Sequence, residues 1–305
     1  MARLFGAGLA LIITLALPAV AQERAAHYGL LVTNDSIGDG HDRWRTGSFA
    51  SSLAYAPGWR GELPRGFGGV WELRFNGQVI GPENAATPAP GDRVYAQALS
   101  FGLHTHFTSG AVEYSLGGDL VLTGPMTQLD HLQEALHDIV GGRDASPAVK
   151  AAQISNDIDP ALVLEAGREF RLGRSARLRP FVEARAGVET LLRAGADLTL
   201  GRFGQSGLLV RAPVTGQRFS AIRDAPYQGF SLILGADVAH VAKSEFLPSR
   251  GVARLSETRA RARAGLHWRS RAGTSAFYGL TWLGEEFDAQ REGQMLGSVQ
   301  LRVQF

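Results

Sequence analysis

Two polar side chains that could carry chemistry, Gln133 and His137, stand four residues apart in the segment Met126–Val140. The segment is predicted to be a helix, because apolar residues recur at helical spacing and no glycine or proline interrupts them. Both polar residues would then lie on one face. A histidine can take a proton near neutral pH, which makes His137 a candidate general base, whereas a glutamine amide can only orient a neighbour. A single helical histidine is, in general, more often a surface or packing residue than a catalyst.

Oxygen-bearing side chains cluster where the first expected strand ends. Asn34 and Asp35 stand there, and a loop rich in glycine and aspartate follows over residues 37–42. These residue types are common in turns, but a carboxylate, an amide oxygen and nearby carbonyls also suit a hard cation such as Ca²⁺. Thr46 opens the next expected strand, and its hydroxyl could donate a hydrogen bond to a developing oxyanion. The chain thus offers a base, a cation site and an oxyanion donor.

The elements that must position these residues are mostly strands. In residues 297–305 polar and apolar residues alternate, with Val299, Leu301, Val303 and the final Phe305 on one face. Similar alternation recurs in segments of about ten residues, as in outer-membrane barrels. Arginines occupy one face of residues 258–269, and residues 177–185 and 72–76 show related patterns. Arginine is costly at a membrane midplane, so these faces must point into a polar lumen, where opposite charges can pair.

Strand signals occur in thirteen segments of the chain. They are residues 27–34, 46–56, 68–76, 93–107, 109–123, 159–171, 177–187, 193–203, 206–213, 227–241, 255–270, 272–285 and 295–305. Bacterial barrels have an even number of strands, so we expect about 12, with the weakest signals between residues 193 and 213. The predicted fold class is all-β, a transmembrane antiparallel β-barrel with one short helix near the active site. A closed barrel satisfies all backbone groups in lipid, so residues 22–305 are expected to form one domain.

The N-terminus has the features of a secretory signal peptide over residues 1–21. Arg3 supplies a positive charge, an apolar run follows, and Ala19-Val20-Ala21 is a typical cleavage site. The mature chain is therefore expected in the bacterial outer membrane, as a monomer. Its formal net charge is only +2 without a basic tract, so no nucleic-acid partner is expected. The chain has no cysteine, which excludes disulfides and thiol chemistry.

An ordered set of motifs over the mature chain resembles the outer-membrane lipid A 3′-O-deacylases of the LpxR type. The motifs are Asn34-Asp35, Asp42-Arg43-x-x-Thr46, Asp92-Arg93-x-Tyr95-Ala96, Gly124-Pro125, Gln133-x-x-x-His137, Gln153 and Glu286-Phe287-x-x-Gln290. No single motif is specific, but the combination is. The resemblance implies a twelve-stranded barrel with a Ca²⁺-dependent site near its outer rim. That site would hydrolyse the ester holding the 3′-acyloxyacyl chain of lipid A, so lipopolysaccharide is the implied substrate.

The resemblance also implies roles for individual residues. His137 takes the place of the family's catalytic base, and Asn34 with Asp35 that of its calcium-site pair. Thr46 is similar to the hydroxyl residue of the site, and Gln133 to the glutamine one helical turn before the histidine. Ester hydrolysis needs a nucleophile, a base and an oxyanion stabiliser, so this set is chemically coherent with water as the nucleophile.

The chain departs from the family pattern at three places. The family commonly reads Tyr-Thr-Asn-Gly where this chain has Arg45-Thr46-Gly47-Ser48, and often Gly-Trp where Ala151-Ala152 precedes Gln153. The family has an acidic residue shortly after the histidine. This chain has no clear equivalent, because Arg143 and Asp144 both stand near that position. These changes concern the surroundings, and hence substrate preference, more than the Asn-Asp, Thr and His positions.

Two other functions fit the same architecture. A phospholipase-type barrel would need a serine beside a strand-borne histidine, and His104 and His106 stand near Ser109 and Ser115. A barrel without catalytic activity, such as a narrow channel or an inactive relative, is the third possibility. No Gly-x-Ser-x-Gly motif supports a serine nucleophile of the α/β-hydrolase kind.

Overall fold

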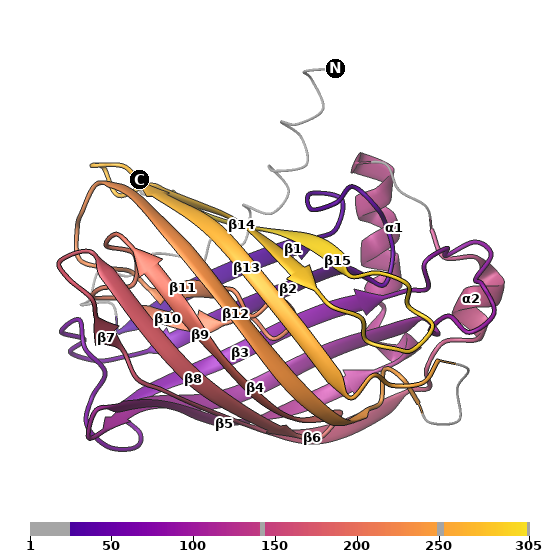
Figure 1. Ribbon diagram of the computed structural model, residues 1–305, viewed down its shortest axis with the longest axis horizontal. Helices are drawn as coiled ribbons and strands as arrows, with labels where there is room; N and C mark the ends of the chain where they lie inside the picture. Colours follow the sequence, from indigo (N-terminus) through magenta and orange to yellow (C-terminus); the bar gives the residue numbers. More distant parts are fainter. Residues whose placement is uncertain (1–24, 141–143, 249–252, 304–305) are drawn as a thin grey trace.

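A computed structural model describes residues 25–140, 144–248 and 253–303, in which long antiparallel strands form a closed barrel (Figure 1). The signal peptide expected over residues 1–21 lies outside the described residues. The twelve strands of the ring are β1 (Ala26–Asn34), β2 (Arg45–Tyr55), β3 (Val70–Ile80), β4 (Ala96–Ser109), β5 (Val112–Thr123), β6 (Asp157–Gly167), β8 (Ala176–Ala186), β9 (Glu189–Leu200), β12 (Gly229–Ser244), β13 (Thr258–Arg269), β14 (Ser275–Leu283) and β15 (Gln294–Arg302). The two-residue β7 (Phe170–Arg171) pairs with the first residues of β8.

Strand pairing follows the order of the chain around the ring. Each strand pairs with its neighbour in sequence, except that β9 pairs with β12, because the chain between them leaves the wall. Pairing of β1 with β15 joins the two ends of the chain, and pairing of β6 with β8 completes the circle. The expected barrel of twelve strands is thereby confirmed.

Apolar side chains cover the outside of the ring, and charged ones fill the inside. Leu73, Leu103 and Leu162 expose 55%, 50% and 66% of their surface, although they lie within strands. In β13 the arginines predicted to face the lumen, such as Arg261 and Arg263, are buried. Exposed apolar residues at every second position suit lipid as the surrounding solvent.

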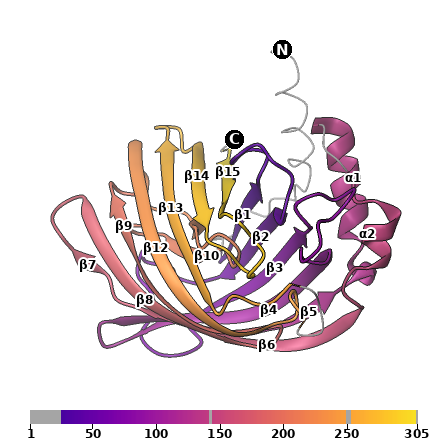
Figure 2. The ribbon, with the colours of Figure 1, turned by 45° about the vertical axis from the view of Figure 1, so that its right-hand side comes forward.

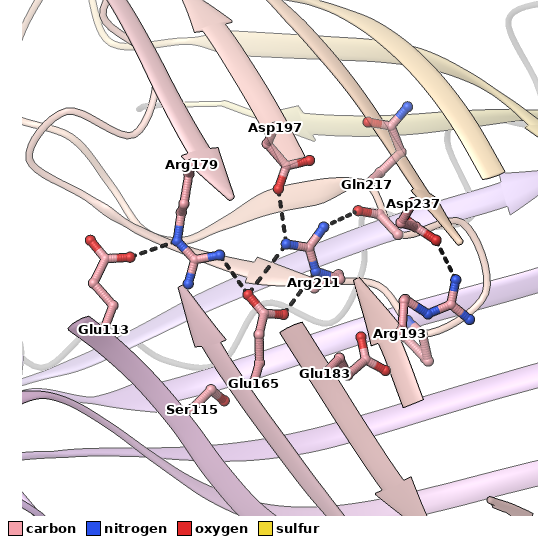
Figure 3. A network of polar contacts seen from close by, with 12 residues as sticks. Glu113, Ser115, Glu165, Arg179, Glu183, Arg193, Asp197, Arg211, Gln217 and Asp237 are labelled. Atoms are coloured by element: carbon pink, nitrogen blue, oxygen red, sulfur yellow. Dashed lines mark hydrogen bonds and ion pairs between the residues drawn. The ribbon is translucent and has the colours of Figure 1, made fainter. Parts of the chain in front are cut away.

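Ion pairs fill the lumen (Figure 3). Arg179 contacts Glu113 at 2.7 Å and Glu165 at 2.6 Å, while Arg211 contacts Glu165 at 2.8 Å and Asp197 at 2.9 Å. Removing one member of such a buried network leaves the other charges uncompensated, which is strongly destabilising. The lumen is therefore a packed charged core instead of a wide pore.

A hairpin of β10 (Leu208–Arg211) and β11 (Arg218–Ile222) folds into the lumen from the stretch between β9 and β12. This corrects the expectation of a strand over residues 206–213, because β10 pairs only with β11 and is no part of the ring. All four residues of β10 are buried. A strand of the ring faces lipid on one side and the lumen on the other, and therefore alternates between apolar and polar residues. A segment buried on both sides, such as β10, has no reason to alternate.

The helix predicted over residues 126–140 is α1 (Leu129–Val140), preceded by the 3₁₀ turn η1 (Pro125–Thr127). It begins later than expected because Gln128 adopts a left-handed conformation (φ 54°), which an α-helix does not continue through. A second helix, α2 (Pro147–Ala151), was not predicted, since five residues are too few for a periodic signal. In the described part of the chain, no helix has the length and apolarity needed to cross a membrane.

Candidate active site

Helix α1 packs on the outer wall of the barrel at the end where β1 finishes (Figure 2). Leu129 of the helix, Val149 of α2, Val79 of β3 and the nearby Tyr95 form one buried apolar cluster. Val79 shares its strand face with the exposed Leu73, so the cluster lies on the lipid side of the wall. The polar face of α1 is thus held at the barrel rim, outside the lumen.

The start of α1 is fixed to the barrel by Gln97 of β4. Its side-chain oxygen accepts hydrogen bonds from the Asp130 backbone N–H (2.9 Å) and the Thr127 hydroxyl (3.1 Å). Free N–H groups at a helix start require such acceptors. The Gln97 amide in turn donates to Gln153 (2.9 Å), so Gln153 supports the helix instead of touching the candidate chemical groups.

The structure brings Gln133 and Thr46 together. The Gln133 amide donates to the Thr46 hydroxyl oxygen (Nε2 to Oγ1, 3.1 Å), and the Tyr95 hydroxyl donates to Gln133 Oε1 (2.8 Å). Thr46 and Tyr95 are buried, whereas Gln133 is half-buried. Gln133 therefore links the helix to the start of β2 and to the residue just before β4.

His137 lies between two carboxylates. Its Nδ1 is 2.8 Å from Oδ1 of Asp144, and its Nε2 is 3.6 Å from Oδ2 of Asp42. The sequence did not show which of Arg143 and Asp144 occupies the position of the family's acidic residue. The contact with His137 is made by Asp144. Arg143 lies outside the described residues. A histidine that donates from Nδ1 to Asp144 keeps a lone pair on Nε2, which is the state a general base requires.

Asp35 is a buried carboxylate suited to a cation. Its Oδ2 accepts from the Arg43 backbone N–H (2.8 Å), but its buried Oδ1 has no hydrogen-bond partner. Burial raises the pKa of Asp35 to about 8, and the nearby carboxylates of Asp42 and Asp39 contribute. An ionised carboxylate in this position would be stabilised by a positive ion, so the residue fits the expected calcium site.

The rest of a cation site would come from amide and backbone oxygens. Among the described residues, no three histidine or acidic side chains converge as a ready-made metal cluster. Asn34 Oδ1 accepts from the Ser36 backbone N–H (2.7 Å) and retains a second lone pair. Asp35 also donates its backbone N–H to the carbonyl of Thr46 (3.2 Å), which places the expected cation pair beside the expected oxyanion donor.

The backbone before Thr46 is held in an unusual shape by Gln294 of β15. Trp44 has φ 49°, a left-handed conformation that is rare outside glycine, asparagine and aspartate. Gln294 accepts from the Arg45 N–H (3.1 Å) and donates to the Arg43 carbonyl (2.6 Å). Sequence reasoning missed Gln294, because it is one of many polar residues that face the lumen.

Glu286 joins two arginines behind the site. It contacts Arg45 at 2.7 Å and Arg93 at 2.6 Å, and Gln290 accepts from its backbone N–H at 2.8 Å. Burial alone would raise the pKa of Glu286, but Arg45, Arg259 and Arg93 together hold it well below its usual value. The Glu286-Phe287-x-x-Gln290 motif therefore holds Arg45, next to Thr46, and Arg93, two residues before Tyr95, from the inner side of the site.

The histidines proposed for a phospholipase-type site lie elsewhere, inside the lumen. His106 Nε2 contacts Glu72 at 2.6 Å and His104 Nε2 contacts Asp119 at 2.9 Å. Ser115 accepts from Arg74 (3.2 Å) and makes no hydrogen bond with either histidine. The geometry gives no serine–histidine pair among these residues.

Comparison with known proteins identifies the family. Residues 8–305 match the family described as "Outer membrane protein LpxR". The chain belongs to the LpxR family. Among solved structures, LpxR from Salmonella typhimurium matches with a TM-score of 0.70 and 18% sequence identity, over 91% of this chain and 100% of that one. No curated protein sequence matches.

The chain also matches a barrel of a different family. The β domain of the Bordetella autotransporter BrkA gives a TM-score of 0.43 at 12% identity, over 92% of this chain and 100% of that one. Membership of the LpxR family and the barrel fold together place the protein in the bacterial outer membrane. They also support an outer-membrane lipid A deacylase, as the resemblance in the sequence implied.

Proposed function

We propose that this protein is a calcium-dependent ester hydrolase that removes the 3′-acyloxyacyl chain of lipid A. The observation that carries the proposal is the face of α1 on the outer wall, where Gln133 bonds Thr46 and His137 bonds Asp144. The candidate base and the candidate oxyanion donor thus lie outside the lumen, where we expect a membrane lipid to reach them. The lumen itself is closed by ion pairs and a hairpin, which argues for chemistry on the outside wall.

The proposed reaction begins with water. His137 Nε2 removes a proton while the water oxygen attacks the ester carbonyl carbon, and the Thr46 hydroxyl donates a hydrogen bond to the oxyanion that forms. Collapse of the tetrahedral intermediate breaks the bond to the sugar 3′ oxygen, which takes the proton back from His137. The products are a sugar hydroxyl and a free acyloxyacyl acid. Asp144 stabilises the protonated histidine between the two transfers.

Asp35, with Asn34 and backbone oxygens beside it, would hold the cation. Bound Ca²⁺ would polarise the ester carbonyl and offset the negative charge of the intermediate. Asp35 fits this role because it is buried, has an oxygen without a partner, and is joined to Thr46 through its backbone N–H.

The proposal is tested on lipid A from cells that carry or lack this protein. Mass spectrometry should show loss of the 3′-acyloxyacyl chain only in cells with the protein. Release of fatty acid from glycerophospholipid instead would indicate the phospholipase-type alternative. Unchanged lipids in the presence of folded protein in the outer membrane would indicate an inactive barrel.

A further inference from the structure

We propose that Tyr95 is a positioning residue that fixes the orientation of the Gln133 amide and so leaves the Thr46 hydroxyl proton free for the substrate. This inference rests on the proposed function and deepens it. Tyr95 is 2% exposed, and its ring lies in the apolar cluster beneath α1. Its hydroxyl is 2.8 Å from Gln133 Oε1, which can only accept a hydrogen bond, so Tyr95 is the donor.

The tyrosine remains a donor under the conditions of the reaction. Burial raises the pKa of Tyr95 well above its usual value, and the carboxylates of Asp130 and Glu134 contribute. A tyrosine hydroxyl is already protonated near neutral pH, and this shift keeps it so. A buried hydroxyl without a partner would cost free energy, so the contact with Gln133 Oε1 is favoured over a flipped amide.

The direction of the second hydrogen bond follows from the first. With Oε1 engaged by Tyr95, the amide turns its N–H group to Thr46, and Thr46 Oγ1 accepts at 3.1 Å. A threonine hydroxyl has a single proton, which is then not used in the bond to Gln133. A flipped amide would present Oε1 to Thr46 instead and would take up that proton. Tyr95 thereby determines whether Thr46 can donate to an oxyanion.

Both ends of this chain of hydrogen bonds, Tyr95 and Thr46, belong to the rim of the barrel. The Tyr95 carbonyl accepts from the Ile154 N–H (3.0 Å). A Cβ atom added to Gly81 would be 3.7 Å from the Tyr95 ring and 3.8 Å from the Thr46 methyl group, so the two side chains flank this glycine. Gln133 is the one member that comes from the helix, and it is oriented by residues of the wall.

The test is a double-mutant cycle on purified full-length protein in lipid vesicles containing lipid A. Tyr95→Phe removes one hydroxyl and keeps the buried ring. We expect it to lower kcat roughly tenfold with little change in KM, less than the ~10²–10³-fold loss on removal of a whole oxyanion donor. In the Thr46→Val background the same change should have no further effect, because no hydroxyl proton remains to be directed. In the Thr46→Ser background, which restores a hydroxyl, the effect should return.

A second variant tests the direction of the hydrogen bonds. Gln133→Glu keeps the shape of the side chain, but its ionised carboxylate only accepts and would draw the Thr46 proton toward itself. It should lower kcat as strongly as Thr46→Val does. Tyr227→Phe is the matched control, since this buried tyrosine bonds His267 (3.1 Å) in the lumen, away from the site, and its loss should leave turnover unchanged.

The outcomes separate this inference from the proposed function. Folded wild-type protein without activity on lipid A would overturn both. Active wild-type protein whose Tyr95→Phe variant turns over at the same rate would overturn the inference alone. An equal fold-loss in the wild-type and Thr46→Val backgrounds would do the same, because it would show that Tyr95 only supports the fold.

Discussion

Asp144 places a carboxylate oxygen 2.8 Å from Nδ1 of His137, so the histidine of α1 is oriented by the loop that follows its own helix. This loop also leads into α2, whose Lys150 contacts Asp130 of α1 at 3.5 Å. The orientation of the candidate base therefore depends on Asp144, as well as on where α1 meets the barrel.

The first prediction concerns this pair. Asp144→Asn keeps an oxygen near Nδ1 but removes the charge that would stabilise a protonated His137. We expect the initial rate of lipid A hydrolysis to fall roughly tenfold or more, since a histidine base depends on its carboxylate partner. Asp138→Asn alters an exposed acid of the same helix and is the control. Equal rates for the two variants would remove Asp144 from the mechanism.

The second prediction concerns the cation. Chelation should abolish hydrolysis and added Ca²⁺ should restore it, because a buried Asp35 with an unpartnered oxygen is suited to bind an ion. Asp35→Asn should raise the Ca²⁺ concentration needed for half-maximal activity, whereas Asp288→Asn, an exposed acid on a loop at the same end, should not. Full activity in excess chelator would contradict the calcium assignment while leaving the fold intact.

The third prediction concerns stability. Glu286→Gln removes the charge that neutralises Arg45 and Arg93, and loss of one partner from a buried pair costs about 3–5 kcal/mol. The barrel should lose its fast-migrating folded band on unboiled gels at a lower temperature than wild type. Glu285→Gln, at the exposed neighbouring position, should not shift that temperature. An unchanged transition for Glu286→Gln would mean that the arginines find other partners.

The barrel could be predicted from sequence because, in a ring strand, the type of each residue indicates whether it faces lipid or the lumen. Arg261 and Leu266 fall on opposite faces of β13 by simple alternation, and the structure buries one and exposes the other. The lumen hairpin could not be predicted in this way. Its Leu208 and Leu209 are both buried, so neighbouring residues carry no contrast. A strand signal there was correct for β10 and wrong for its place in the fold.

The site could be predicted only where spacing along one element determines it. Gln133 and His137 share a helix, and their separation of four residues suffices to place them together. The sequence could not show whether Arg143 or Asp144 stands next to His137. Both residues follow the helix, and the direction of a side chain in a loop cannot be predicted from residue spacing. Gln294 was missed since nothing in β15 distinguishes it from the other inward polar residues. Such contacts depend on strands that are distant in sequence.

The most direct test of the proposed mechanism is the turnover of His137→Ala compared with His131→Ala. Both residues are on α1, and His131 is exposed, so the pair controls for any effect of losing a helical histidine. With both variants folded in vesicles containing lipid A, His137→Ala should release the 3′-acyloxyacyl chain at least about a hundredfold more slowly, the usual scale for loss of a positioned base. His131→Ala should match wild type. A near-normal rate for folded His137→Ala would contradict His137 as the general base.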